Sequence, residues 1–342
     1  MKILVRATNW VGDAIMALPA LRAVRARFPQ AEITILARPY VAFLYKNQGV
    51  CDIIIDLDHN RDVASVLRAR KFDTALLLQN AFGAAWLTWR AGIPERIGYA
   101  RDGRSLLLTK AVRIPKPGEI PAHEQYYYLE LLRRIGWLES LPNESFIHLE
   151  VPQEERNRSE EFLLSAGVKR DALRVAIGAG ASYGSAKCWP PDRFAELANR
   201  LQAEDAKASV DVILFGTRVE ATVSLAIAAG MRRPPIDLTG KTAINDLPAL
   251  LSQCHLFVGN DSGAMHVAGA VGLPVVAVFG PTDPFGTAPV TPRCSIVQEK
   301  TYCSPCFLRR CPTDHRCMTR VTPDAVAAAA KKWISGIEVR TA

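Results

Sequence analysis

Two common nucleotide-binding patterns are missing from this chain of 342 residues. No glycine-rich GxGxxG turn follows the first expected strand of either half, which disfavours a dinucleotide-dependent dehydrogenase. No GxxxxGK[ST] pattern occurs, which disfavours a P-loop triphosphatase. A phosphate ligand would therefore have to be held by some other arrangement.

Membrane and targeting segments are also missing. No run reaches the roughly 18 apolar residues that a spanning helix needs. The N-terminus enters an expected strand, residues 2–5, without a secretory signal pattern. RNA-binding signatures are absent, so no nucleic-acid partner is expected. We expect a cytoplasmic protein.

The chain length and the order of its elements predict two domains. A chain of 342 residues exceeds what one hydrophobic core usually holds. Strand-like and helix-like segments alternate through the first half, and the rhythm restarts near residue 174, which is typical of doubly wound parallel sheets. We expect an α/β protein with an N-terminal domain over 1–168 and a C-terminal domain over 169–342. Pro19 lies inside the helix expected over 13–28 and predicts a kink there.

The net charge of +8 favours a polyanionic partner. Basic residues recur between residues 61 and 116: Arg61, Arg68, Arg70, Lys71, Arg90, Arg96, Arg101, Arg104, Lys110, Arg113 and Lys116. Such a series is often an ordinary solvated surface. The functional alternative is contact with an anionic membrane surface or a phosphorylated glycolipid.

Two strand-to-helix junctions carry the strongest functional signal. One is Gly12-Asp13, and the other is the segment GNDSGAMH over residues 259–266. Helix N-termini that follow parallel strands are common phosphate sites, because their N–H groups are unpaired and the helix dipole is positive there. Asp13 either stabilises its helix dipole or acts as a base that takes a proton from an attacking hydroxyl.

Further polar groups are expected near the second junction. Lys187, in the loop GASYGSAKCWP, either neutralises a diphosphate or is an exposed loop lysine. The N–H groups of Ser262 and Gly263 should face phosphate oxygens, and His266 follows one turn later as a further donor or as a core histidine. Thr282 and Asp283 follow the next strand, where Asp283 before proline could equally form a turn.

Two possible metal motifs need separate interpretation. Asp56-Leu57-Asp58 has the outline of a DxD motif, but we interpret it as a strand-end turn, and no metal cofactor is required because Lys187 and helix dipoles can carry the charge. Four cysteines crowd into CSPCFLRRCPTDHRC, with His315 among them: Cys303, Cys306, Cys311 and Cys317. They could bind zinc, or they could be reduced structural thiols or a redox-labile loop.

Together these motifs resemble the glycosyltransferase family 9 heptosyltransferases. The resemblance rests on GDAIMALPAL near the start, on the KCWP segment and on NDSGAMHVAGAVGLPVVAVFGPTDP. It implies a GT-B fold, in which two Rossmann-like domains with parallel sheets face each other across a cleft. It implies ADP-L-glycero-D-manno-heptose as the donor and a heptosylated Kdo-lipid A core as the acceptor, transferred with inversion. It also implies a peripheral position on the cytoplasmic face of the inner membrane.

The same resemblance gives roles to individual residues. It implies that Asp13 is the general base and that Lys187 steadies the departing phosphates. Donor binding is assigned to Glu220 at the nucleoside, to Asp261, Ser262, Gly263, Ala264 and His266 at the diphosphate, and to Thr282 and Asp283 beside the sugar. The last helix is expected to cross back onto the N-terminal domain. Open alternatives are a relative with another acceptor, such as a different core sugar or a protein hydroxyl, and a non-catalytic nucleotide- or metal-binding scaffold.

Overall fold

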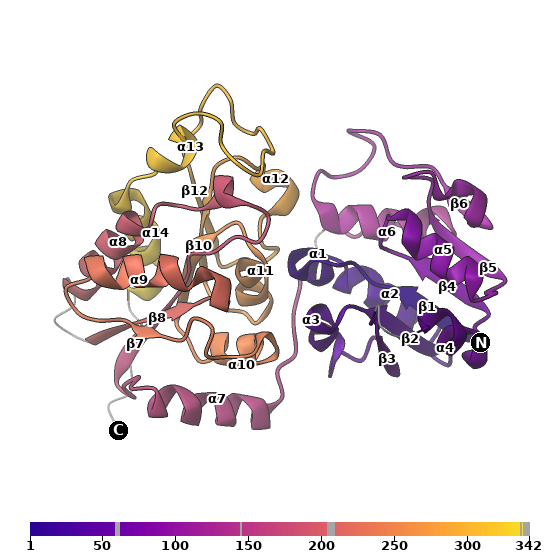
Figure 1. Cartoon of the computed structure of the whole chain (residues 1–342), viewed down its shortest axis with the longest axis horizontal. Helices are drawn as coiled ribbons and strands as arrows, with labels where there is room; N and C mark the ends of the chain where they lie inside the picture. The colour runs from indigo at the N-terminus through magenta and orange to yellow at the C-terminus, as the bar shows by residue number, and fades with distance from the viewer. Residues whose placement is uncertain (59–61, 144–145, 204–208, 336, 338–342) are drawn as a thin grey trace. The chain divides into compact units, whose positions relative to one another are not determined.

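A computed structural model describes residues 1–58, 62–143, 146–203, 209–335 and 337, so Arg61 of the basic series lies outside the described residues. The chain divides into two compact units, Met1–Ile147 and His148–Ala342. Each unit is built around a six-stranded parallel sheet (Figure 1). The expected α/β class with two Rossmann-like units is confirmed.

The sheet of the first unit has the strand order β3-β2-β1-β4-β5-β6. Its strands are β1 (Lys2–Arg6), β2 (Glu32–Ala37), β3 (Ile53–Asp56), β4 (Thr74–Leu77), β5 (Glu95–Tyr99) and β6 (Lys110–Val112). Its helices are α1 (Val11–Met16), α2 (Leu18–Arg27), α3 (Pro39–Ala42), η1 (Phe43–Tyr45), α4 (Val63–Arg70), α5 (Phe82–Arg90), η2 (Arg104–Leu107) and α6 (Glu124–Arg134). The order reverses between β1 and β4, and the crevice at such a switch point is where doubly wound sheets bind ligands.

The sheet of the second unit repeats this plan, with the strand order β12-β11-β10-β7-β8-β9. Its strands are β7 (Ala172–Gly178), β8 (Ser209–Phe215), β9 (Ile236–Asp237), β10 (Leu256–Asn260), β11 (Val275–Phe279) and β12 (Cys294–Gln298). The helices are α7 (Gln153–Ser165), η3 (Ser185–Lys187), α8 (Pro191–Ala203), η4 (Arg218–Glu220), α9 (Ala221–Gly230), η5 (Ile244–Asp246), α10 (Leu247–Leu251), α11 (Gly263–Ala270), α12 (Pro284–Thr287), α13 (Arg316–Thr319) and α14 (Pro323–Ile334). Here the switch point lies between β7 and β10.

Local sequence explains the break in the first long helical segment. Helix α1 ends at Met16 and α2 begins at Leu18, with Pro19 in the first turn of α2. Proline is tolerated in a first helical turn because the N–H that it lacks would have no intrahelical acceptor there. The predicted kink is therefore present as a break at Ala17.

The boundary between the units and the last helix bear on the sequence-based expectation. The division falls after Ile147 rather than after residue 168, because α7 packs against α10 of the second unit and the Leu149 amide donates to the Ala270 carbonyl at 2.8 Å (Figure 1). The last helix, α14, buries Val326 and Ala330 in the core of the second unit against α8, β10, β11 and β12. Our expectation that this helix also reaches the first domain stays a prediction.

Candidate functional site

The switch point of the second unit brings three predicted site residues into contact. The Nζ atom of Lys187, at the end of η3, lies 2.5 Å from Oδ2 of Asp261, which directly follows β10. The Thr282 hydroxyl, on the loop after β11, donates to the same Oδ2 at 2.7 Å. The Lys187 and Asp261 side chains are only 11% and 5% exposed. Residues from three separate loops therefore converge on one buried carboxylate at the carboxyl edge of the sheet.

Buried hydrogen bonds behind this cluster fix the ends of the strands. Asn260, the last residue of β10, accepts from the Trp189 amide at 2.9 Å and donates to the Ala179 carbonyl at 2.6 Å. Trp189 is fully buried, and its indole N–H donates to the Val321 carbonyl at 3.0 Å. Asn260 and Trp189 thereby hold the loops on both sides of Lys187. The sequence did not single them out, although both lie inside the quoted motifs.

The predicted phosphate junction is a helix start. Ser262 is the N-cap of α11, and its hydroxyl accepts from the Met265 amide at 3.4 Å. Gly263 and Ala264 are the first helical residues, and His266 is buried in the same turn. Amides in a first helical turn lack intrahelical acceptors, and the dipole is positive there, so this end of α11 suits an anion beside Lys187.

Two other predicted donor residues make local capping interactions. The Glu220 carboxylate accepts from the Thr217 amide at 2.6 Å and from the Thr217 hydroxyl at 2.9 Å. It also lies over Gly180, where an added Cβ would collide with it. The Asp283 side chain caps α12 by accepting from the Phe285 amide at 3.0 Å. The structure thus places Glu220 against the loop after β7, whereas Asp283 forms the turn that the sequence offered as an alternative.

The segment 301–317, called here the Cys-rich segment, braces the loops of this site. The Cys306 and Phe307 amides both donate to the Pro281 carbonyl, at 3.0 and 2.8 Å. The Ala186 amide donates to the Arg309 carbonyl at 3.1 Å, and His315 Nε2 lies 2.6 Å from the Ala186 carbonyl. The segment therefore ties the Lys187 loop to the loop that carries Thr282.

Tyr183 connects the Cys-rich segment to the Lys187 side chain. Its hydroxyl donates to the Phe307 carbonyl at 2.7 Å. The Lys187 ammonium lies 4.7 Å from the centre of the Tyr183 ring, and the Arg309 guanidinium lies 5.3 Å from it. Both distances are within cation–π range. Tyr183 was not among the predicted site residues, although its place between Gly180 and Gly184 was a usable signal.

The four thiols of the Cys-rich segment do not form a zinc site in the structure. All four cysteines are free, and among the described residues no three His, Cys, Asp or Glu side chains are grouped to hold a metal ion. Burial, aided by the charges of the other three thiols, raises the pKa of Cys317 to about 11. Our zinc alternative is corrected on this geometry, since the segment contacts the site through backbone groups, Ser304 and His315 instead.

Asp13 lies at the switch point of the first unit, in the first turn of α1. It helps to line a pocket of about 250 Å³. The other lining residues come from the loop after β1, the loop after β4, the loop after β5 and helix α6: Thr8, Trp10, Leu78, Gln79, Asn80, Ala81, Arg101, Asp102 and Tyr128. The aspartate therefore faces a cavity, where a bound hydroxyl could meet it.

The charge of the Asp13 carboxylate acts on two buried tyrosines, Tyr45 and Tyr128. Burial raises the pKa of Tyr128 well above its usual value, and the negative charge of Asp13 raises it further. The pKa of Tyr45 is raised for the same two reasons. Both phenols therefore stay protonated over the physiological range beside the Asp13 carboxylate.

Arg104 donates hydrogen bonds to two residues that line this pocket, Gln79 and Asn80. Its fully buried guanidinium donates to the Gln79 carbonyl, to Asn80 Oδ1 at 3.0 Å and to the Tyr99 carbonyl at 2.9 Å. Burial lowers its pKa to about 10. The sequence counted Arg104 as a surface cation, but the structure makes it an internal support for two residues that line the pocket.

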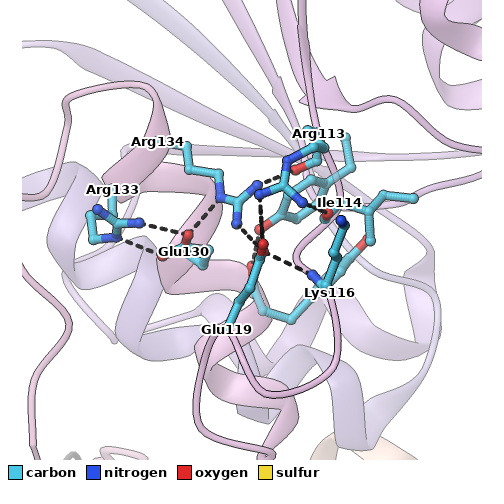
Figure 2. Close-up of polar contacts among 9 residues, drawn as sticks. Arg113, Ile114, Lys116, Glu119, Glu130, Arg133 and Arg134 are labelled. Atoms are coloured by element: carbon cyan, nitrogen blue, oxygen red, sulfur yellow. Dashed lines mark hydrogen bonds and ion pairs between the residues drawn. The ribbon is translucent and has the colours of Figure 1, made fainter.

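Another member of the basic series, Arg113, is paired with an acid within the first unit. Figure 2 shows Glu119 between Arg113 and Arg134, with Arg134 reaching on to Glu130. The Glu119 carboxylate also accepts from the Lys116 amide at 2.9 Å. These contacts, led by that of Arg113, lower the pKa of Glu119 to about 2. The basic series is therefore only partly available to an outside anion.

Two Rossmann-like units, each with polar residues at the switch point of its sheet, have the architecture of the GT-B class of glycosyltransferases. The family model described as glycosyltransferase family 9 (heptosyltransferase) matches residues 61–316. The chain belongs to glycosyltransferase family 9.

Named relatives and solved structures agree with this assignment. The chain is 30% identical over 314 residues to lipopolysaccharide heptosyltransferase 2 of Salmonella typhimurium, covering 87% of this chain and 88% of the relative. The structure of the Escherichia coli ADP-heptose lipopolysaccharide heptosyltransferase II matches with a TM-score of 0.83 and 27% identity, covering 97% of this chain and 98% of that one. A family 9 glycosyl transferase from Veillonella parvula has the same fold, with a TM-score of 0.85, 23% identity and 98% of both chains covered.

Proposed function

We propose that this enzyme transfers L-glycero-D-manno-heptose from ADP-heptose to a heptosyl-Kdo-lipid A inner core, with inversion at the anomeric carbon. The single observation that carries the proposal is the convergence of Lys187 and Thr282 on Asp261 beside the start of α11. This is a preorganised cation and helix end suited to a leaving diphosphate. Similarity to heptosyltransferases of the lipopolysaccharide core supports the choice of donor and acceptor.

The reaction is a single displacement. An acceptor hydroxyl attacks the anomeric carbon while Asp13 takes its proton, the new C–O bond forms, and the bond to the ADP phosphate oxygen breaks. The ADP leaves with the bonding electron pair, and the anomeric configuration inverts. Lys187 and the N-terminal amides of α11 stabilise the charge that develops on the diphosphate, so this mechanism uses no metal ion.

The remaining donor contacts belong to the same proposal. In this proposal the Glu220 carboxylate, which lies beside Gly180, binds the nucleoside ribose. Ser262, Gly263, Ala264 and His266, in the first turn of α11, bind the diphosphate. Thr282 and Asp283 lie on the loop assigned to the donor sugar.

The acceptor side is assigned to the first unit and to a membrane surface. No described helix is long and apolar enough to cross a membrane. Residues 1–147 contain 20 Lys and Arg against 14 Asp and Glu, so this unit carries a net charge of +6 of the total of +8. We assign the enzyme to the cytoplasmic face of the inner membrane, where a phosphorylated glycolipid would be presented to the Asp13 pocket.

The test is ADP release from ADP-heptose in the presence of heptosyl-Kdo-lipid A, with mass spectrometry of the product. The expected result is one added heptose, and an Asp13→Ala control should give almost none. Reactions without acceptor, with other ADP-sugars and with other core acceptors establish specificity. Turnover only with a different acceptor would overturn the acceptor assignment, and binding of ADP without turnover on any acceptor would favour a non-catalytic role.

A further inference from the structure

Helix α5 exposes its aromatic side chains and buries two alanines and a threonine. Ala84, Ala85 and Thr88 face the core, whereas Phe82, Trp86 and Trp89 are 46–48% exposed. An ordinary surface helix turns its large apolar residues inward, so this helix has the reverse pattern. Three exposed aromatic side chains on one helix require a partner, because adjoining apolar groups rarely face water without a function.

The exposed aromatic rings form one continuous row. The rings of Phe82 and Trp86 are stacked with centres 6.4 Å apart, and those of Trp86 and Trp89 lie 4.9 Å apart. Leu106 is 96% exposed on η2, which packs against α5. These four residues, Phe82, Trp86, Trp89 and Leu106, are called the α5 strip.

Cations lie beside one end of the α5 strip. Arg68, at the end of α4, donates to the carbonyl of Arg90, at the end of α5, at 2.6 Å, so the two helix ends are adjacent. Arg70 and Lys71 come two and three residues after Arg68. Asp62 pairs with Arg90 at 3.7 Å and offsets part of this charge. Since Arg113 and Arg134 are engaged with acids in Figure 2, this group at the helix ends is a cationic surface of the unit distinct from that network.

The other end of the α5 strip begins at the Asp13 pocket. Ala81, the N-cap of α5, and its neighbour Asn80 both line that pocket. Phe82 is the next residue along the chain. A ligand surface that covers the α5 strip would therefore extend to the rim of the pocket.

We propose that the α5 strip docks the enzyme on a lipid bilayer with anionic headgroups. This inference rests on the proposed function, because it is the glycolipid acceptor that would bring the pocket to a membrane. Tryptophan favours the interface between headgroups and acyl chains, and arginine and lysine beside it are attracted to anionic lipid. The almost fully exposed alkyl chain of Leu106 fits acyl chains, whereas it offers no flat face for stacking on a sugar ring.

The experiment measures membrane partition independently of catalysis. Wild type is mixed with vesicles of phosphatidylethanolamine and phosphatidylglycerol, or with pure phosphatidylcholine, and followed by sedimentation and tryptophan fluorescence. We expect binding and a blue shift with the anionic vesicles. The variant Trp86→Gln/Trp89→Gln/Leu106→Gln should bind at least about tenfold less, whereas Leu225→Gln, which changes an exposed leucine of α9, should bind like wild type.

Turnover on a membrane-embedded and on a water-soluble acceptor distinguishes membrane docking from other roles of the α5 strip. The triple variant should lose at least about tenfold in turnover on lipid A core acceptor embedded in vesicles, and keep wild-type turnover on the deacylated, water-soluble acceptor. Unchanged vesicle binding overturns the proposal, and so does equal loss on both acceptors, which would indicate sugar binding or partner-protein contact. If wild type turns over neither acceptor, the proposed function fails, while the vesicle measurement still decides the docking surface.

Discussion

The Lys187 ammonium and the Thr282 hydroxyl both donate to Oδ2 of Asp261, at 2.5 and 2.7 Å. Lys187 is thereby held in place before a donor binds, beside the start of α11. A buried pair of this kind has two separable consequences. It stabilises the fold only so long as both partners are present, and it leaves a fixed cation for a diphosphate.

Removing the lysine alone should affect both stability and activity. Lys187→Met leaves the Asp261 carboxylate buried without its cation, so we expect a loss of about 3 kcal/mol of unfolding free energy. We also expect donor affinity to fall about tenfold or more. In the double variant Lys187→Met/Asp261→Asn the uncompensated charge is gone, so stability should largely return while turnover stays low. Urea unfolding and ADP-release kinetics measure the two effects, and recovery of turnover in the double variant would show that Lys187 serves only to satisfy Asp261.

Asp13 is expected to act on turnover and not on donor binding. Asp13→Asn keeps the size of the side chain but cannot accept a proton, so turnover should fall about 10²- to 10⁴-fold. ADP affinity, measured by calorimetry, should be unchanged because the proposed donor site lies in the second unit. Asp102→Asn is the matched control, since Asp102 lines the same pocket and is paired with Arg101 at 3.6 Å. Equal losses in the two variants would contradict the role of Asp13 as the base.

Much of this site follows from the sequence through one topological rule. The junctions after β1 and β10 were visible as apolar strands followed by helix starts, and the parallel order places such junctions at a switch point. Lys187 and Thr282 could be named because they also follow strands of the same sheet. What the sequence did not predict is their common contact with Asp261, because it depends on how three loops fold over the sheet edge.

The sequence-based interpretations of Arg104 and of the Cys-rich segment differ from the structure for the same reason. Both depend on where the tertiary fold puts a side chain, which residue type and spacing do not determine. The basic series suggests a surface cation at Arg104, yet its guanidinium is fully buried and donates to the Gln79 and Tyr99 carbonyls and to Asn80. The Cys-rich segment looked like a metal site because spacing alone does not show where a thiol points. In the structure, that segment instead holds Tyr183 and the Lys187 loop.

Close packing between Gly184 and Arg309 gives a test of this brace. A Cβ at residue 184 would collide with the Arg309 carbonyl oxygen, so Gly184→Ala must displace either the Lys187 loop or the Cys-rich segment. We expect a higher KM for the donor and a lower kcat. Gly83→Ala is the control, because a Cβ there meets nothing within 4 Å. Tyr183→Phe, which loses one hydrogen bond but keeps the ring under Lys187, should have a smaller effect, and unchanged kinetics in Gly184→Ala would contradict the bracing role.

Thiol reactivity should rank the cysteines by their surroundings. Hydrogen bonds from Thr313 lower the pKa of Cys311, whereas burial raises the pKa of Cys254 and Cys294 to about 12. Because the thiolate is the reactive form, Cys311 should be carbamidomethylated well before Cys254 and Cys294 at pH 8. A time course with iodoacetamide followed by peptide mass spectrometry measures the order. Protection of Cys311 that is released by a chelator would instead indicate a metal held by the Cys-rich segment.

The network around Glu119 predicts how stability depends on pH. Arg113, the Lys116 amide and Arg134 lower the pKa of Glu119 from an ordinary 4.5 to about 2 (Figure 2). A carboxyl group with a lowered pKa stabilises the folded state above its ordinary pKa and loses this contribution as the pH falls toward its folded value. Wild type should therefore lose stability more steeply than Glu119→Gln between pH 4.5 and about 2. Urea unfolding midpoints of both proteins, measured across this pH range, test the prediction. Glu139→Gln, which changes an exposed glutamate of the same unit, is the control. Parallel curves for wild type and Glu119→Gln would show that these contacts do not hold the carboxylate in its charged form.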